Sequence, residues 1–268
     1  MMDLKKKKLF LLDMDGTIYL GDHLFDGTLD FLRQVKANGG RYLFVTNNSS
    51  RSVDAYVQRL VNMGIDFTTK EDFLTSVDAT IWYLRAHGKQ NAKIYASGTR
   101  TFREQLAGAG FSITDHLEDH IDLLVSGFDT ELTFQKLEDS CILLGRGVDW
   151  VATNPDWVCP TWYGSVPDCG SVCRMLTTAT GREPLFLGKP KPAMVELALR
   201  RTGFTPEQAV IIGDRLYTDI ACGVNAGIDS IFVLSGEGTE ADIAQYGIHP
   251  TWIFSDIAAL YRQLEETL

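Results

Sequence analysis

The stretch LFLLDMDGTIYLGD, residues 9–22, decides the fold and raises the question of function. Residues 9–12 form an apolar run typical of a buried strand, and Gly16 marks the point where the chain turns. Asp13 and Asp15 follow that run at once, separated by a single methionine. Two carboxylates at the end of a buried strand repel each other and resist desolvation, so folding alone does not explain them. They require a cation, a shared proton or chemistry centred on a phosphate.

Strand-like and helix-like segments alternate on both sides of this stretch. Residues 41–46 read as a buried strand that ends in polar residues, and residues 52–63 as an amphipathic helix. Residues 209–212 read as another strand, followed by a glycine, a loop and a helix. This alternation predicts an α/β fold with a Rossmann-like parallel sheet covered on both faces. In such sheets, ligands bind beyond the carboxyl ends of the strands.

Polar residues follow the predicted strands at that edge of the sheet. They are Asp13, Asp15, Thr46, Asn47, Asp214 and Asp219. Lys189 lies between an apolar triplet and a helix predicted to begin at Pro192, which places it near the same edge.

Composition limits the classes of partner. The 268 residues carry a formal net charge of −10, which argues against nucleic acid or an anionic membrane surface as the main partner. The basic run at residues 5–8 precedes too few apolar residues for a signal peptide, and no stretch reaches membrane-spanning length. The five scattered cysteines read as reduced thiols. We therefore expect a cytoplasmic protein without a membrane partner.

The middle of the chain reads as a separate unit. Its strand-like segments are residues 93–97, 121–125 and 149–153, and its helix-like segments are residues 100–109 and 133–144. This block lies between the Thr46 and Lys189 segments and is long enough to bury its own core. We expect residues 1–79 and 184–268 to form a catalytic core, with residues 80–183 as an inserted α/β domain.

The residue types at the sheet edge suit phosphate chemistry. Three acids without a histidine or thiolate favour Mg²⁺ over zinc, and Lys189 would add a fixed positive charge on a phosphate. One aspartate of the Asp13/Asp15 pair could attack phosphorus, and the other could protonate the leaving group. Each residue also has a purely structural reading. The Asp15 segment could be a simple turn, Lys189 an exposed loop residue and Asp214 a helix cap.

Four motifs carry a resemblance to a known family. DMDGTIY, VTNNSS, GKPKP and GDRLYTDI resemble, in this order, the four motifs of the haloacid dehalogenase superfamily of phosphotransferases. The segments DGTIY, TNN and TNPD and the late insertion are similar to one branch, the NagD-like and p-nitrophenylphosphatase-like enzymes with a large α/β cap of the C2 type.

The resemblance implies a role for each matching residue. Asp13 would be the nucleophile and Asp15 the general acid and base. Thr46, Asn47 and Lys189 would bind the phosphate.

The resemblance also implies a magnesium site. Asp13, the backbone carbonyl of Asp15 and Asp214 would be ligands of Mg²⁺, with Asp219 behind them in the second shell. These roles imply a Mg²⁺-dependent hydrolase of a small phosphomonoester that works through an aspartyl-phosphate.

Residues 153–172 are the candidate substrate loop, because the family's cap closes over the site with a segment in this region. The loop contains three aromatic residues, Trp157, Trp162 and Tyr163. They could stack on a substrate ring, with Trp162 as the candidate, but we favour packing under the cap. Asp168 or Asp156 could meet a cationic or hydroxylated leaving group, or could be a surface acid.

Two other classes of function remain as alternatives. A signalling receiver also forms a phosphoaspartate, but it is a single domain of about 120 residues, and Asp15 here offers an acid that would hydrolyse the phosphoaspartate quickly. A non-catalytic phosphate-binding module is the second alternative, although no motif position is degraded. Within the phosphatase reading, a sugar phosphate, a nucleotide or a related metabolite could be the substrate, and a homodimer is possible.

Overall fold

The computed structural model describes residues 4–161 and 163–267. Its contacts divide the chain into two compact units. The core unit comprises residues 4–46, Tyr56–Leu74 and 189–267, and the cap unit comprises Asn47–Ala55 and Thr75–Gly188. Among the described residues, no helix has both the length and the apolar character needed to cross a bilayer.

The core unit is built on a six-stranded sheet with the order β15-β14-β13-β1-β4-β5. Its strands are β1 (Leu9–Leu12), β4 (Arg41–Thr46), β5 (Phe73–Thr75), β13 (Ala209–Gly213), β14 (Asp229–Val233) and β15 (Trp252–Phe254). β1 pairs in parallel with both β4 and β13, so it lies at the centre of the sheet. All four of its residues are buried, which explains why the segment is apolar on both faces.

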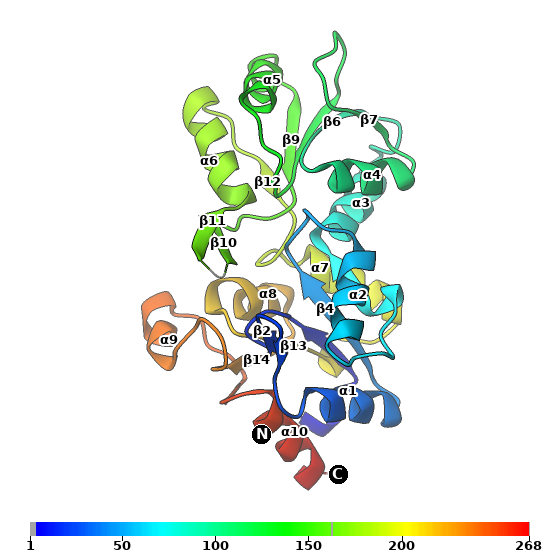
Figure 1. Ribbon diagram of the computed structural model, residues 1–268, viewed down its shortest axis with the longest axis vertical. Helices are drawn as coiled ribbons and strands as arrows, with labels where there is room; N and C mark the ends of the chain where they lie inside the picture. Colours follow the sequence, from blue (N-terminus) through cyan, green and yellow to red (C-terminus); the bar gives the residue numbers. More distant parts are fainter. Residues whose placement is uncertain (1–3, 162, 268) are drawn as a thin grey trace. The chain divides into compact units, whose positions relative to one another are not determined.

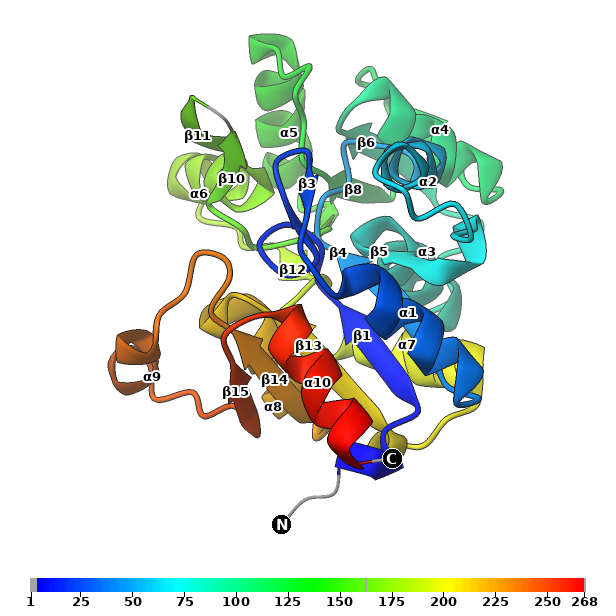
Figure 2. The same cartoon turned by 60° about the horizontal axis from the view of Figure 1, so that its bottom comes forward.

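Helices cover this sheet on its two faces, as Figure 2 shows with α1 and α10 in front and α7 and α8 behind. The helices of the core unit are α1 (Thr28–Ala37), α7 (Ala193–Thr202), α8 (Ala221–Ala226), α9 (Glu240–Tyr246) and α10 (Ile257–Thr267). α1 turns its buried residues Phe31, Leu32 and Val35 inward. α7 follows Pro192, the residue at which the sequence predicts its start.

The cap unit has its own parallel sheet, with the order β12-β9-β8-β6-β7. Its strands are β6 (Lys93–Ser97), β7 (Ser112–Thr114), β8 (Leu123–Ser126), β9 (Asp149–Ala152) and β12 (Leu185–Phe186). Its helices are α3 (Ser76–Ala86), α4 (Arg100–Gly108), α5 (Phe134–Gly145) and α6 (Cys169–Thr180). α3 and α4 pack on one face and α5 and α6 on the other, each pair over a separate apolar cluster (Figure 1).

Side-chain caps fix where the cap-unit helices begin. The side chains of Thr75, Thr99, Thr133 and Asp168 each accept a hydrogen bond from a backbone N–H in the first turn of the helix that follows. Such caps satisfy donors that the helix itself leaves unpaired.

Short elements complete the chain. They are the hairpins β2 (Tyr19–Leu20) with β3 (His23–Leu24) and β10 (Val158–Thr161) with β11 (Gly164–Pro167), the helix α2 (Val53–Asn62), and the short helical turns η1 (Leu4–Lys6), η2 (Lys70–Asp72), η3 (Pro206–Gln208) and η4 (Leu216–Ile220).

The unit boundaries differ from the predicted ranges in one informative respect. The long segment of the cap unit begins at Thr75 and ends at Gly188, whereas the sequence predicts an inserted domain at residues 80–183. The cap unit also takes in Asn47–Ala55, which the sequence reading assigned to the core. The chain therefore changes unit directly after Thr46 and again directly before Lys189, two residues that the sequence assigns to phosphate binding.

Candidate active site

The carboxyl edge of the core sheet brings together residues that are far apart in the sequence. Asp13 follows β1 and its backbone N–H donates to Ile212 O of β13 at 2.9 Å. Thr46 is the last residue of β4, and Asp214 follows β13 directly. Because these strands are parallel neighbours, their ends meet at one edge, as the sequence predicts.

Lys189 is the centre of the site. Its Nζ donates to Asp13 Oδ1 and to Asp219 Oδ1, both at 2.6 Å, and to Val45 O at 3.1 Å. The residue is only 3% exposed. Burial alone would lower the pKa of Lys189, but the charges of Asp13 and Asp219 raise it above its ordinary value. Lys189 is therefore a fixed cation, not an exposed loop lysine.

Three carboxylates lie close together here, and two of them, Asp13 and Asp219, contact the ammonium group of Lys189. One oxygen from each of Asp13, Asp214 and Asp219 lies within 4.8 Å of the others. Desolvation, opposed by Lys189 and reinforced by Asp219, raises the pKa of Asp13 to about 6. Desolvation together with the charges of Asp13 and Asp219 raises the pKa of Asp214 to about 7. The cluster holds more negative charge than its lysine neutralises.

The donor set fits a hard divalent cation. Asp214 Oδ2 accepts a hydrogen bond from Glu237 N at 2.8 Å. Asp214 Oδ1 is buried, and among the described residues no hydrogen-bond donor reaches it. A buried carboxylate oxygen without a partner is costly unless a ligand takes that place. Oxygen-only ligands favour Mg²⁺ or Ca²⁺ over zinc.

Glycines let the backbone pass close to Asp214. Gly16 has φ +80°, a conformation that favours glycine, and a Cβ there would collide with the Asp214 carboxylate. A Cβ at Gly236 would collide with the same group. These two glycines leave the space that the Asp214 carboxylate occupies.

Asp219 lies behind the other acids, on the π-helical turn η4. It is fully buried, and its Oδ2 accepts from Arg215 N at 3.3 Å while its Oδ1 accepts from Lys189. Gly213 allows this approach, because a Cβ there would overlap Asp219. A π-helical turn of this kind is frequent at functional sites. Asp219 thus positions Lys189.

Asp15 differs from the buried acids because it is exposed. Partial burial raises its pKa above the ordinary value, and the charges of Arg59 and Arg215 oppose that shift. Arg59 also lies over the ring of Tyr19, with its guanidinium carbon 4.5 Å from the ring centroid. An accessible carboxyl group with a raised pKa suits proton transfer.

The sequence reading did not single out Arg59 or Arg215. Arg215 pairs with Glu237 at 2.9 Å, and its charge acts on Asp13 and Asp214. Its position directly after Asp214 was the available signal. Arg59 lies on α2, and nothing in the local sequence indicates that it approaches Asp15.

The residues of the predicted substrate loop belong to the cap unit. Trp157 is 60% exposed and Tyr163 is 65% exposed, so the cap unit does not bury either ring in its own core, and the expected packing under the cap stays a prediction. They lie at and near the hairpin β10–β11, which is too short to bury them. Trp162 lies outside the described residues.

Asp168 is engaged in the cap unit. It is 4% exposed, and its carboxylate caps α6 and accepts from Asn154 Nδ2 at 3.0 Å. These contacts support a structural role for Asp168, and its contact with a substrate stays a prediction. Asn47, the residue after Thr46, donates from Nδ2 to Asp156 Oδ2 at 3.0 Å.

Two family models match the chain. One, described as haloacid dehalogenase-like hydrolase, matches residues 10–112, and a second, HAD-hydrolase-like, matches residues 186–260. The first range contains Asp13, Asp15 and Thr46, and the second contains Lys189 and Asp214.

Curated and solved relatives match almost the full chain. An acid sugar phosphatase of Staphylococcus aureus is 32% identical over 263 residues, which cover 98% of this chain and all of that protein. A 4-nitrophenylphosphatase from Thermotoga maritima has a TM-score of 0.92 at 39% identity and covers 97% of this chain and 98% of that one.

A third relative was solved with a metal. The glycerol phosphate phosphatase of Mycobacterium tuberculosis in complex with magnesium has a TM-score of 0.88 at 34% identity, covering 95% of this chain and 76% of that one. Sequence motifs, fold and relatives thus agree. The chain belongs to the haloacid dehalogenase-like hydrolases, and among them it is a phosphatase of the NagD-like and p-nitrophenylphosphatase-like branch.

Proposed function

We propose that this phosphatase hydrolyses small phosphomonoesters through an aspartyl-phosphate on Asp13, with Mg²⁺ as its metal. The proposal is carried by the cluster of three carboxylates beside one lysine and by Asp214 Oδ1, which no donor among the described residues reaches. A bound cation would offset the repulsion between these carboxylates and would also hold a phosphate group beside them.

The first half-reaction forms the phosphoenzyme. An oxygen of Asp13 attacks phosphorus, and the bond between phosphorus and the leaving oxygen breaks. Asp15 gives its proton to that oxygen, so an alcohol leaves and Asp15 becomes a carboxylate. Lys189, held by Asp219, offers positive charge to the phosphoryl oxygens, and the Thr46 hydroxyl donates to another of them.

The second half-reaction restores the enzyme. Water attacks phosphorus of the aspartyl-phosphate, and Asp15 takes a proton from that water. The bond between phosphorus and the Asp13 oxygen breaks, which releases inorganic phosphate and a free carboxylate. The exposure of Asp15 supports both proton transfers, because solvent can reach its carboxyl group.

Asp13, Asp214 and the backbone carbonyl of Asp15 would hold the Mg²⁺ ion. When bound, the ion neutralises charge on the phosphoryl oxygens and lowers the mutual repulsion of the acids. This assignment is supported by the oxygen-only donor set and by the magnesium complex of the mycobacterial relative.

The substrate class follows from the relatives and from the cap unit. Relatives named acid sugar phosphatase and glycerol phosphate phosphatase support a small hydroxylated phosphomonoester, with nucleotides as the next class. The cap, proposed as an inserted domain near residues 80–183, would choose among leaving groups through the exposed side chains of Trp157 and Tyr163. We also propose a reducing, cytoplasmic setting, in which the five scattered cysteines are reduced thiols.

A phosphatase assay with a panel of phosphomonoesters tests the proposal. We expect phosphate release from p-nitrophenyl phosphate and from sugar phosphates with Mg²⁺, and loss of activity with a chelator. The phosphoenzyme should be trapped by acid quench with the wild-type chain and not with Asp13→Asn. Activity that survives complete metal removal, or a phosphoenzyme in Asp13→Asn, contradicts the proposal.

A further inference from the structure

Within the cap unit, the segment after Thr46 is held by the loop after β9. Asn47 is 6% exposed, and its Nδ2 donates to both carboxylate oxygens of Asp156, at 3.0 and 3.2 Å. The two residues are 109 positions apart in the sequence. A carboxylate that accepts from an amide nitrogen determines which end of the amide faces it, because the amide oxygen cannot take that place.

A buried chain of hydrogen bonds supports this contact. Ser49 Oγ accepts from Phe128 N at 2.8 Å and lies 3.1 Å from Thr153 Oγ1. Thr153 Oγ1 donates to Asn154 Oδ1 at 2.8 Å, and Asn154 Nδ2 donates to the Asp168 carboxylate that caps α6. Residues 47–49 and the start of the substrate loop thus form one connected polar cluster.

Two glycines show how closely the backbones approach. Gly188 N donates to Thr153 O at 2.7 Å, and a Cβ at Gly188 would lie 2.5 Å from Asn47 Oδ1. Gly170 N donates to Asp156 O at 2.8 Å, and a Cβ at Gly170 would overlap the Pro155 carbonyl. No side chain fits at either position. The main chain at Gly188 therefore lies directly against Asn47, and the main chain at Gly170 lies directly against Asp156.

The covalent chain links this cluster to the phosphate site. Asn47 is bonded to Thr46, and Gly188 is bonded to Lys189. Consecutive Cα atoms are about 3.8 Å apart, so Asn47 and Gly188 lie directly next to Thr46 and Lys189 along the chain. Asp156 carries a negative charge that would repel a phosphate group brought next to it. A carboxylate at Asp156 is therefore a poor direct ligand for the phosphate, and the contact that the structure shows is with Asn47.

We infer that Asp156 is a positioning residue, which acts on the phosphate through the side-chain amide of Asn47. The inference rests on the proposed function and on the role that the family resemblance implies for Asn47, which is to bind the phosphate. One N–H of the Asn47 amide is enough for Asp156, and the second serves the phosphate oxygen. The substrate loop thereby contributes to binding the phosphate, which every substrate shares, and not only to recognising the leaving group.

Kinetics of Asp156→Ala test this role. Loss of a hydrogen bond to a charged group predicts a fall in kcat/KM of roughly 10- to 100-fold, and a matching rise in the inhibition constant of inorganic phosphate. The fall should be equal for small and large phosphomonoesters. Asp156→Asn keeps one acceptor oxygen and should recover most of the loss.

A double variant separates positioning from an independent effect. If Asp156 acts through Asn47, the variant with both Asn47→Ala and Asp156→Ala should be no weaker than Asn47→Ala alone. Asp149→Ala is the matched control, because Asp149 is a cap acid paired only with Lys89 at 3.0 Å among the contacts described for its side chain. That control should keep its kcat/KM within about twofold of the wild-type value.

A readout that needs no activity tests the geometry itself. The side-chain amide resonance of Asn47 in a ¹⁵N-labelled chain should show slow hydrogen exchange in the wild type and fast exchange in Asp156→Ala. Unchanged exchange, additive losses in the double variant or losses that depend on the leaving group would each overturn the inference. A wild-type chain that hydrolyses no phosphomonoester refutes the proposed function instead, while the amide measurement still decides the role of Asp156.

Discussion

The core sheet and the cap sheet both place charged residues at the carboxyl ends of parallel strands, but they balance those charges differently. In the core unit, Asp13, Asp214 and Asp219 lie close together, and the ammonium group of Lys189 contacts Asp13 and Asp219. The pKa values of Asp13 and Asp214 rise, mainly through desolvation, and Asp214 Oδ1 has no hydrogen-bond partner in the described part of the chain.

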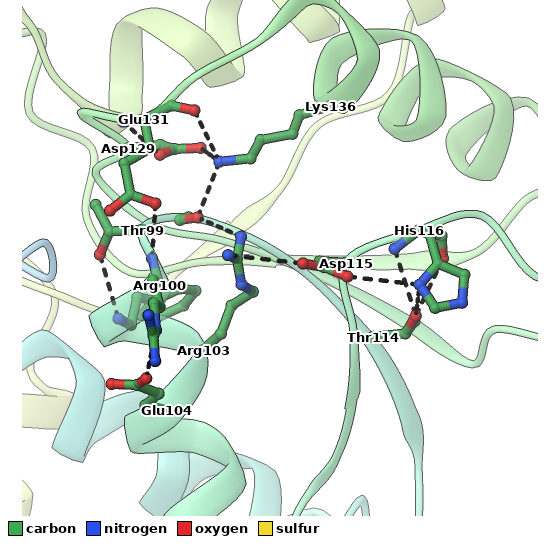
Figure 3. Close-up of polar contacts among 12 residues, drawn as sticks. Thr99, Arg100, Arg103, Glu104, Thr114, Asp115, His116, Asp129, Glu131 and Lys136 are labelled. Carbon is green, nitrogen blue, oxygen red and sulfur yellow. Dashed lines mark hydrogen bonds and ion pairs between the residues drawn. The ribbon is translucent and has the colours of Figure 1, made fainter.

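In the cap unit, each acid at the corresponding edge has its own partners (Figure 3). Asp129 Oδ2 accepts from Lys136 Nζ at 2.7 Å and its Oδ1 accepts from Glu131 N at 2.9 Å. Arg103 pairs with Asp115 at 3.6 Å. The cap edge is therefore complete without a ligand.

The comparison shows what indicates a reactive site in this fold. Position at the carboxyl edge is common to both sheets, so position alone does not separate them. The distinguishing feature is uncompensated negative charge in a desolvated place. The following predictions test that distinction.

The largest effects should come from replacing one acid at the carboxyl edge of each sheet by asparagine. Asp13→Asn should lower turnover by roughly 10⁴-fold or more, because the nucleophile is lost. Its free energy of unfolding should be equal or higher in the absence of metal, because repulsion falls. Asp129→Asn should show the opposite pattern, with activity kept and stability lowered by about 1–3 kcal/mol. Assays of phosphate release and urea unfolding on both variants measure this, and parallel losses in both would refute the distinction.

Asp15→Asn should have the next largest effect. Loss of proton transfer predicts a fall in kcat of roughly 10²–10⁴-fold. With p-nitrophenyl phosphate, whose leaving group needs little protonation, the first half-reaction should persist and the second should be slow. Stopped-flow absorbance should then show a burst of p-nitrophenol of one equivalent per chain. A slow linear time course contradicts the assigned roles.

The raised pKa values predict a pH effect on stability in the metal-free chain. Asp214 ionises near 3.8 when unfolded and near 7 when folded, so the folded chain binds more protons between these values. Its favourable contribution is complete below pH 4 and is lost as the pH rises through 7, at about 1.4 kcal/mol per pH unit.

Thermal unfolding in chelator from pH 4 to 8 measures this difference between the wild type and Asp214→Asn. The wild-type Tm should fall relative to the variant as the pH rises, and Mg²⁺ at pH 7.5 should raise the wild-type Tm alone. Equal pH profiles of the two chains would show that folding does not raise the pKa of Asp214.

The smallest effects should come from the cap surface. Tyr163→Ala should change KM a few-fold and alter the ranking of phosphomonoesters, because its exposed ring is available to the leaving group. Dependence on Mg²⁺ concentration should stay constant. Phe134→Ala is the matched control, since Phe134 is also an exposed aromatic residue of the cap unit, at 80%, and lies outside the substrate loop. Equal effects of the two changes contradict a specific role for Tyr163.

Much of the fold could be predicted from local sequence. The expected strand at residues 41–46 coincides with β4, and the expected helix at residues 52–63 contains α2. Strand periods and caps act over a few residues, so they are visible in sequence. The α/β class and the phosphatase assignment were confirmed for the same reason, because the motifs follow strands directly.

The features that could not be predicted depend on contacts between segments that are distant in the sequence. The assignment of residues 47–55 to the cap unit follows from contacts such as that of Ser49 with Thr153. The burial of Asp168 depends on Asn154 and on α6, and the exposure of Tyr163 on how little covers a short hairpin. None of these approaches leaves a periodic signal in the chain.

The central position of β1 has a consequence for how the protein is made. β1 pairs on one side with β4 and on the other with β13, which the ribosome adds only after the whole of the cap unit. During synthesis, the cap sheet can form while one edge of the apolar strand β1 is still unpaired, because β13 has not yet been made. Such an edge is prone to pair with other chains, which makes this interval a natural point for chaperone binding. Asp13 therefore emerges early, and its surroundings are completed late.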